Sequence, residues 1–89
     1  MHAAGFTRNP NSGLPEGLRG TYSGLVEKIP YLQELGITAV ELLPVMAFDP
    51  WDAPAGQRNY WGYSPVSFFS PHPFYSSRYN DGNLLGPVN

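Results

Sequence analysis

The sequence predicts an α/β fold, because a helical pattern leads directly into a buried strand pattern and then into a long segment without periodicity. Helical periodicity covers residues 21–35, and a nearly continuous apolar run follows over residues 37–45. A helix that passes through one glycine into a buried strand is half of a βαβ unit. We therefore expect one such unit, followed by a long loop that begins near Met46.

The N-terminal segment precedes this unit. Residues 1–7 are expected to be the frayed end of a strand, and residues 8–20, rich in Pro, Gly and Asn, are expected to be a loop. The start of the chain lacks the basic lead and long apolar core of a signal peptide. The apolar run at residues 39–46 contains Glu41 and Pro44 and is too short to span a bilayer. These features favour a cytoplasmic protein without a membrane partner.

The predicted helix over residues 21–35 has one apolar face. Its members are spaced as neighbours on the surface of a helix: Leu25, Ile29, Leu32 and Leu35. Thr21 or Ser23 can cap its N-terminus, and Gly36 suits a left-handed stop. Pro30 lacks a backbone donor and disfavours helical geometry at the preceding residue, so a kink or a fresh start is expected there.

The segment Ile37–Val45 is rich in β-branched and aliphatic residues and contains one carboxylate, Glu41. Nearly continuous hydrophobicity is typical of a parallel strand that is covered on both faces. An unpaired buried carboxylate is costly, so Glu41 must be paired, protonated or directed at a polar cavity. A catalytic role is conceivable, because catalytic carboxylates have shifted pKa values, but we favour a structural one.

The segment after residue 45 holds ten of the 13 aromatic residues and six of the ten prolines. Unstructured loops longer than roughly 12–15 residues are usually either functional or disordered. The aromatic density favours a functional loop. In α/β proteins a loop that leaves the C-terminal end of a strand lies on the face where ligands bind.

Composition excludes several classes of function. The net charge is −2 and the five Arg and Lys residues are scattered, which argues against a nucleic-acid partner. Without cysteine there is neither a disulfide framework nor a thiolate metal site. Charged residues make up only 13% of the chain, against roughly 25% in ordinary soluble domains. We therefore expect neighbouring protein to cover part of the apolar surface of this chain, as it would if the chain were a piece of a larger domain.

Four consecutive segments carry a resemblance to a known family. They are Gly5-Phe-Thr-Arg8, the segment from Gly20 to Pro44, Asn59-Tyr-Trp-Gly-Tyr-Ser-Pro65 and Phe69-Ser-Pro-His72. In order and spacing they resemble the α-amylase superfamily (glycoside hydrolase family 13), and in particular its glycogen-debranching and isoamylase-type enzymes. Branching enzymes and trehalose-releasing hydrolases share the Glu-Leu-Leu-Pro strand and the Trp-Gly-Tyr loop, so they remain alternatives within the family.

The resemblance implies a fragment of a (β/α)8 TIM barrel, with residues 1–89 forming part of one catalytic domain and no second domain. The fragment would run from the end of the first strand, through the first helix and second strand, into the long aromatic loop. A complete barrel needs roughly 250 residues. The family's three catalytic carboxylates lie on later strands, so no catalytic residue is assigned here. Residues 79–83 depart from the family pattern.

Substrate contacts are assigned to Tyr63, Asn59 and Trp61 by the same resemblance. The tyrosine of the Trp-Gly-Tyr loop resembles a platform that stacks on the sugar next to the scissile bond, and aromatic faces suit the C–H face of a sugar. Packing that holds the loop is the favoured role of Tyr60 and Trp61. Asn59 is either a turn residue or a supporting hydrogen-bond donor.

Other polar residues of the loop have simpler explanations. Asp49 and Asp52 could be paired glycosidase carboxylates or part of a calcium site, but aspartate is also an ordinary turn residue, and we favour that role. His72 is expected to be a packed loop residue. His2 has no partner cluster, so no metal or other cofactor is expected.

The resemblance implies a piece of a retaining glycoside hydrolase that cleaves α-1,6 branches in glycogen-like α-glucans, and we expect this piece to contribute one wall of the substrate cleft. Alone the chain would be inactive and would depend on the remainder of the barrel for stability. Two rivals from other classes remain open. One is a non-catalytic glucan-binding piece or pseudoenzyme, and the other is a structural remnant without a stable fold.

Overall fold

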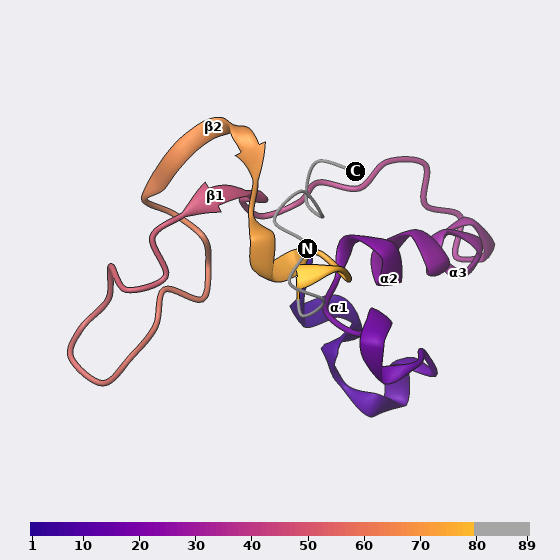
Figure 1. Ribbon diagram of the computed structural model, residues 1–89. Coiled ribbons are helices and arrows are strands. Elements are labelled where there is room, and N and C mark those ends of the chain that lie inside the picture. The colour runs from indigo at the N-terminus through magenta and orange to yellow at the C-terminus, as the bar shows by residue number, and fades with distance from the viewer. Residues whose placement is uncertain (80–89) are drawn as a thin grey trace.

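A computed structural model describes residues 1–79 and separates a helical part from a two-stranded hairpin (Figure 1). The helices are α1 (Gly5–Arg8), α2 (Tyr22–Glu27) and α3 (Ile29–Glu34), and the strands are β1 (Met46–Phe48) and β2 (Pro65–Pro71). Short 3-10 helices cover Pro10–Ser12, Glu16–Leu18 and Pro73–Tyr75. The chain therefore combines helices with a small sheet, which agrees with the α/β class. Of the segment that departs from the family pattern, residues 80–83 lie outside the described residues.

The predicted helix with a break at Pro30 is confirmed as the pair α2 and α3. The hydroxyl of Thr21 caps α2 by accepting a hydrogen bond from the backbone N–H of Gly24 at 3.1 Å. Lys28 ends α2 and precedes α3, in whose first turn Pro30 lies, where a missing N–H costs nothing. Gly36 has φ of +84° and ends α3, as predicted. No helix within residues 1–79 is long and apolar enough to cross a bilayer.

The N-terminal strand end predicted for residues 1–7 is wrong for most of that segment. Backbone hydrogen bonds from Phe6 to His2 and from Arg8 to Ala4, each 3.1 Å long, form α1 instead. Because no strand among residues 1–79 pairs with residues 5–8, a helical turn satisfies these backbone groups locally. Met1 alone behaves as a strand residue. Its amino group donates to the Glu41 carbonyl at 2.8 Å, and its carbonyl accepts from Leu43 N–H at 2.8 Å.

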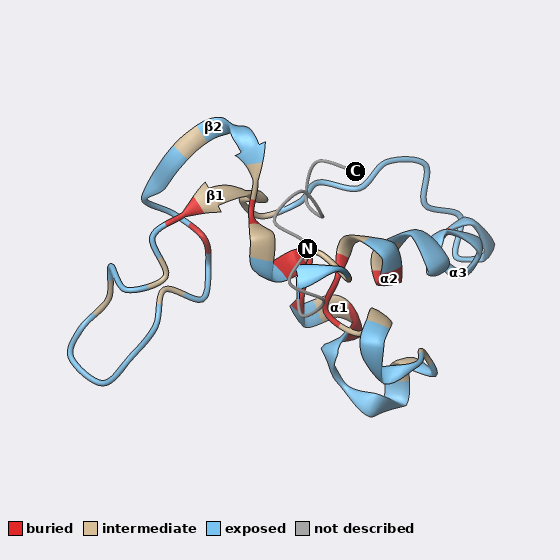
Figure 2. Ribbon diagram, viewed as in Figure 1, coloured by how far each residue is buried: buried red, intermediate tan, exposed pale blue. Residues whose placement is uncertain are grey.

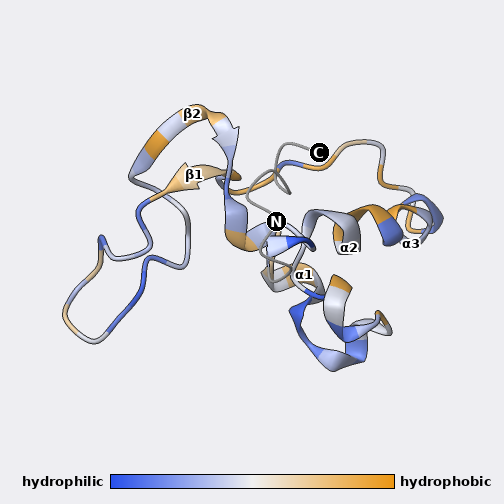
Figure 3. Ribbon diagram, viewed as in Figure 1, coloured by the Kyte–Doolittle hydropathy of each residue, from blue (hydrophilic) through white to orange (hydrophobic). Residues whose placement is uncertain are grey.

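The apolar segment 37–45 is not a strand of the sheet, so the predicted buried parallel strand is wrong in this chain. It passes from α3 to β1 without regular secondary structure, and Figure 3 shows hydrophobic residues, in orange, along much of it. The side chains of Ile37, Val40 and Leu42 are exposed. A parallel strand needs neighbours along both edges and cover on both faces, and the described residues supply only Met1 at one edge. Glu41 is consequently exposed rather than buried.

The segment after residue 45 is not entirely a loop, in contrast to the prediction. β1 and β2 pair antiparallel, with Met46 opposite Pro71 and Phe48 opposite Pro65, and the register is irregular between these pairs. Valine and two phenylalanines favour a strand in β2, while its prolines occupy the two ends, where a missing donor is tolerated. The hairpin thus carries residues 49–64 as its loop, which Figure 1 shows extending away from the helices.

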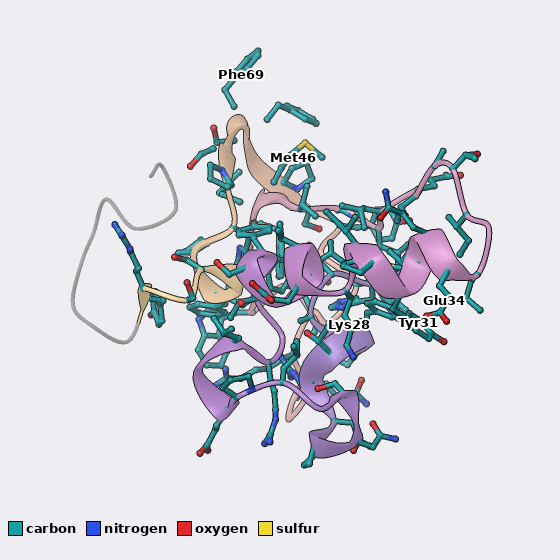
Figure 4. The ribbon with its side chains drawn as sticks, turned by 90° about the vertical axis from the view of Figure 1, so that its right-hand side faces the viewer. Lys28, Tyr31, Glu34, Met46 and Phe69 are labelled. Carbon is teal, nitrogen blue, oxygen red and sulfur yellow. The ribbon has the colours of Figure 1, made fainter. Side chains whose placement is uncertain are left out.

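The buried core lies where the N-terminal segment, β1 and the 3-10 helix Pro73–Tyr75 meet (Figure 2). It consists of Ala3, Ala4, Phe48 and Tyr75, with Tyr22 and Val45 packed against it. Most other large apolar side chains are exposed. The side chain of Phe69 on β2 is fully exposed and points away from the rest of the molecule (Figure 4).

We expect the isolated chain to be marginally stable or to aggregate. The core is small, and the free edge of β2 with exposed Phe68 and Phe69 offers an open template for pairing with another chain. Urea titration followed by circular dichroism should show a shallow transition or none. A sharp, cooperative unfolding of a monomer would contradict this expectation.

Candidate functional site

The hairpin loop 49–64 is organised by the side chain of Asn59. Its Nδ2 donates to the carbonyl of Asp49 at 3.1 Å and to the carbonyl of Tyr63, while its Oδ1 accepts from Gly62 N–H at 3.2 Å. The Asn59 backbone N–H also donates to the carbonyl of Pro50 at 2.9 Å. Asn59 therefore acts both as a turn residue and as a hydrogen-bond donor, and it joins the two arms of the loop.

Gly62 lets this loop close onto the ring of Phe48. Its φ is +86°, a conformation that other residues rarely adopt. A Cβ at this position would lie 3.1 Å from two ring carbons of Phe48 and from the carbonyl oxygen of Pro44. This close contact fixes the backbone at Gly62 against the buried ring of Phe48, and thereby the position from which Tyr63 follows.

The aromatic side chains of Tyr63 and Trp61 are 60% and 57% exposed, so their ring faces are accessible to a ligand. Trp61 makes edge contacts with Tyr60 and His2, at centroid distances of 5.2 Å and 6.2 Å. Tyr60 stacks flat on His2, with centroids 4.1 Å apart and planes 7° from parallel. Tyr60 therefore packs the loop against the N-terminal segment, while the substrate contacts of Tyr63, Asn59 and Trp61 stay predictions.

Asp49 and Asp52 shape the first turn of the loop. Asp49 Oδ1 accepts from the backbone N–H of Trp51 at 2.9 Å, which is an Asx turn. Asp52 Oδ2 accepts from the hydroxyl of Ser64 across the loop. Both carboxylates therefore have the turn role that we favoured. Within residues 1–79, no three His, Asp or Glu side chains come close enough together to hold a metal ion.

His72 is packed in the interior, as predicted, and lies against the base of the hairpin. Its ring stacks on Phe48 at a centroid distance of 3.7 Å, and it is only 2% exposed. Nδ1 of His72 accepts from Phe48 N–H at 3.4 Å, whereas Nε2 has no hydrogen-bond partner. Removal from water lowers the pKa of His72, so the ring is neutral near pH 7.

Two tyrosines of the same region, the half-buried Tyr22 and the buried Tyr75, were missed by sequence reasoning. The hydroxyl of Tyr22 on α2 lies 2.9 Å from the Val45 carbonyl and 3.1 Å from the His72 carbonyl, and burial raises its pKa to about 12. The hydroxyl of Tyr75 is buried without a partner. No periodicity distinguishes either residue from other aromatics, so the sequence held no signal for these positions.

Comparison with known proteins finds relatives that match most of this chain. The chain is 45% identical over 83 residues to "Isoamylase 3, chloroplastic" of Oryza sativa subsp. japonica, which covers 86% of this chain and 11% of that protein. It is 44% identical over 84 residues to "Glycogen operon protein GlgX homolog" of Haemophilus influenzae, covering 90% of this chain and 13% of the relative.

The similarity extends along the whole chain in a third relative. "Isoamylase SU1, chloroplastic" of Zea mays is 40% identical over 91 aligned positions, which cover 100% of this chain and 11% of that protein. No protein-family model matches the chain. The chain therefore spans only about a tenth of the length of the curated relatives that it matches.

Proposed function

Because the chain belongs to the isoamylase and GlgX type of the α-amylase superfamily, we propose that it forms part of the catalytic domain of an α-glucan hydrolase. The reaction would be hydrolysis of α-1,6 branch linkages in a glycogen-like glucan. The observation that carries the proposal is the ordered Asn59–Tyr63 loop, which presents Tyr63 and Trp61 with accessible faces at a fixed place above Phe48.

The contribution of this segment is one wall of the substrate cleft. The face of Tyr63 would stack on the C–H face of the sugar next to the scissile bond, and its phenol would remain available for a hydrogen bond. Asn59 supports this arrangement, because it binds the carbonyl of Tyr63 directly and fixes the backbone from which the ring projects. Trp61, which makes edge contacts with Tyr60 and His2 and is 57% exposed, would extend the apolar surface.

Bond cleavage in a retaining enzyme requires a nucleophilic carboxylate and an acid/base carboxylate about 5–5.5 Å apart. Asp49 and Asp52 are engaged in the turn. The resemblance implies that the family's catalytic carboxylates lie on later strands, so both groups would come from parts of the full-length protein beyond this segment. Within residues 1–79 the role of the chain is therefore to bind and orient the substrate.

A barrel is the proposed context of the segment. Met1 donates to Glu41 and accepts from Leu43, two residues apart on one edge, which is how a residue in a parallel ladder bonds to its neighbour. A groove of about 240 Å³ between α2, α3 and residues 40–42 is lined entirely by apolar side chains, including Leu25, Leu32 and Leu42. Both features support a segment 37–45 that becomes a covered parallel strand when further strands are present.

The test compares the 89-residue chain with the full-length protein on glycogen and on linear maltooligosaccharides. We expect the full-length protein to release branches from glycogen and the isolated chain to release no reducing ends, because neither attack nor leaving-group protonation is available to it. Glycogen binding by a full-length protein that hydrolyses nothing would favour the non-catalytic alternative. Hydrolysis by the repurified 89-residue chain above a heat-killed control would contradict the assignment of roles.

A further inference from the structure

Trp51 lies in the first turn of the hairpin loop and is 67% exposed, more than Tyr63 or Trp61 of the same loop. Apolar side chains that are exposed singly are common on protein surfaces and need no explanation. Trp51, however, shares loop 49–64 with the accessible rings of Tyr63 and Trp61, and Figure 2 shows that most of this loop is exposed. Three large aromatic side chains that are exposed on one loop indicate a binding surface.

The ring of Trp51 is restrained by Arg58, which belongs to the other arm of the loop. The guanidinium carbon of Arg58 lies 4.6 Å from the centroid of the Trp51 ring, and a cation in this position is attracted by the ring face. Because Arg58 covers one face and the residue is still 67% exposed, the opposite face of the indole is open. The pair therefore presents a flat apolar face beside the N–H donors of a guanidinium.

Hydrogen bonds join the turn that contains Trp51 to the residues around Tyr63. Asp49 Oδ1 accepts from the Trp51 N–H at 2.9 Å, and the N–H of Asp49 donates to the Ser64 carbonyl at 3.2 Å. Nδ2 of Asn59 donates to the carbonyls of both Asp49 and Tyr63. Trp51 and Tyr63 therefore belong to one hydrogen-bonded unit of the loop.

The same contacts limit the distance between the two aromatic residues. Through the hydrogen bond between Asp49 and Ser64, the Cα atoms of Trp51 and Tyr63 lie within about 18 Å of each other by the standard dimensions of the backbone. A few linked glucose units bridge such a distance. Glucose offers C–H faces to aromatic rings and hydroxyl oxygens to N–H donors, which is what Trp51 and Arg58 together suit.

We propose that Trp51, restrained by Arg58, is a second platform for the α-glucan and stacks on a glucose unit away from the scissile bond. The inference rests on the proposed glucan-hydrolase function and adds a residue that sets its preference for longer substrates. A contact with a remote sugar stabilises the bound substrate and the transition state equally. Trp51 therefore acts on KM and leaves kcat unchanged.

The experiment measures kcat and KM of the full-length protein on branched maltooligosaccharides that are lengthened on either side of the branch. For Trp51→Ala we expect KM to rise about three- to tenfold on the longer substrates, as loss of one aromatic contact predicts. On the shortest substrate that the original protein cleaves, KM should change by less than about twofold. Trp51→Phe should have a smaller effect than Trp51→Ala, because it keeps part of the ring face.

Tyr31→Ala is the matched control. Tyr31 on α3 is 50% exposed, and Nζ of Lys28 lies 5.8 Å from its ring centroid, so it also pairs a cation with an exposed aromatic ring (Figure 4). Since α3 lies apart from the hairpin loop in Figure 1, Tyr31→Ala should keep the KM of the original protein at every substrate length. Arg58→Ala should raise KM on the longer substrates, because the ring of Trp51 loses the group that restrains it.

The outcomes separate this inference from the function on which it rests. If the original protein cleaves branched glucans and Trp51→Ala has an unchanged KM at every length, Trp51 is not a platform and the proposed function stands. A lower melting temperature of Trp51→Ala without a change in length dependence would mean that another part of the protein covers Trp51, which also overturns the inference. A full-length protein that neither binds nor cleaves any α-glucan would overturn the proposed function and this inference together.

Discussion

For the proposed α-glucan hydrolase, Tyr63→Ala in the full-length protein is expected to lower kcat/KM on a branched maltooligosaccharide by at least about tenfold. Loss of an aromatic contact removes about 0.5–1.5 kcal/mol beyond the buried area. A sugar displaced from its reactive position can lose a further factor of ~100. Stacking should also strengthen as the ring flattens toward the oxocarbenium-like transition state, so the loss is expected in kcat as well as in KM.

Two further variants make this result specific to the ring face. Tyr63→Phe should lose much less than Tyr63→Ala, because it keeps the face and removes only the hydroxyl. Tyr79→Ala is the matched control, since Tyr79 is also exposed and makes an edge contact with Phe74. If Tyr63→Ala and Tyr79→Ala were equally mild, Tyr63 would be an ordinary loop residue.

Gly24→Ala should produce the largest loss of stability of any single-methyl addition at the glycines of residues 1–79. A Cβ on this buried residue of α2 would overlap the carbonyl oxygen of Leu18 and would lie 3.2 Å from the hydroxyl oxygen of Thr7. The carbonyl belongs to the backbone and cannot rotate away, so α2 must move. We expect a cost of at least about 2 kcal/mol, in the upper part of the range for overpacked sites.

At an unobstructed glycine in a helix, substitution by alanine would instead raise the stability, by up to about 1 kcal/mol. Gly17→Ala is the control, because a Cβ there meets nothing within 4 Å and the residue is exposed. Thermal unfolding of the full-length protein with each substitution provides the comparison. A Gly24→Ala variant as stable as Gly17→Ala would mean that α2 does not press against Leu18.

The helical pair could be predicted because its signals are local. Thr21 caps α2 through a residue three positions away, Pro30 restarts the helix within one turn, and Gly36 ends α3 by its own conformation. Each of these effects depends on neighbours within about four residues. A single sequence therefore contains all the information that they need.

The strand predictions failed because strands depend on distant partners. Residues 37–45 have the composition of a buried parallel strand, but only Met1 bonds to one edge of them, and the first residues formed a helix instead. The pairing of β1 with β2 depends on Phe48 meeting Pro65 across 16 intervening residues, and no local pattern specifies that register. Hydrophobic periodicity shows which faces of a strand are buried, but it does not show which other strand pairs with it.

One part of the candidate site could be predicted from the sequence and another part could not. The Asn59–Tyr63 loop was found from its motif, and its internal bonds explain why the asparagine stands four residues before the tyrosine. The unpartnered polar atoms of His72 and Tyr75 could not be predicted, because the sequence does not specify which buried polar groups lack a hydrogen-bond partner in the fold.

The hydroxyl of Tyr22 also has a consequence for the order in which the chain folds. It joins α2 to the ends of both strands, across separations of 23 and 50 residues. A helical peptide of ~20 residues relaxes in about 0.1–1 μs and hairpins form in about 1–10 μs, and longer loops close at greater entropic cost. We therefore expect α2 and the hairpin to form separately and then to dock. The two hydrogen bonds of the Tyr22 hydroxyl would then form last, because the carbonyls of Val45 and His72 come together only after β1 and β2 have paired.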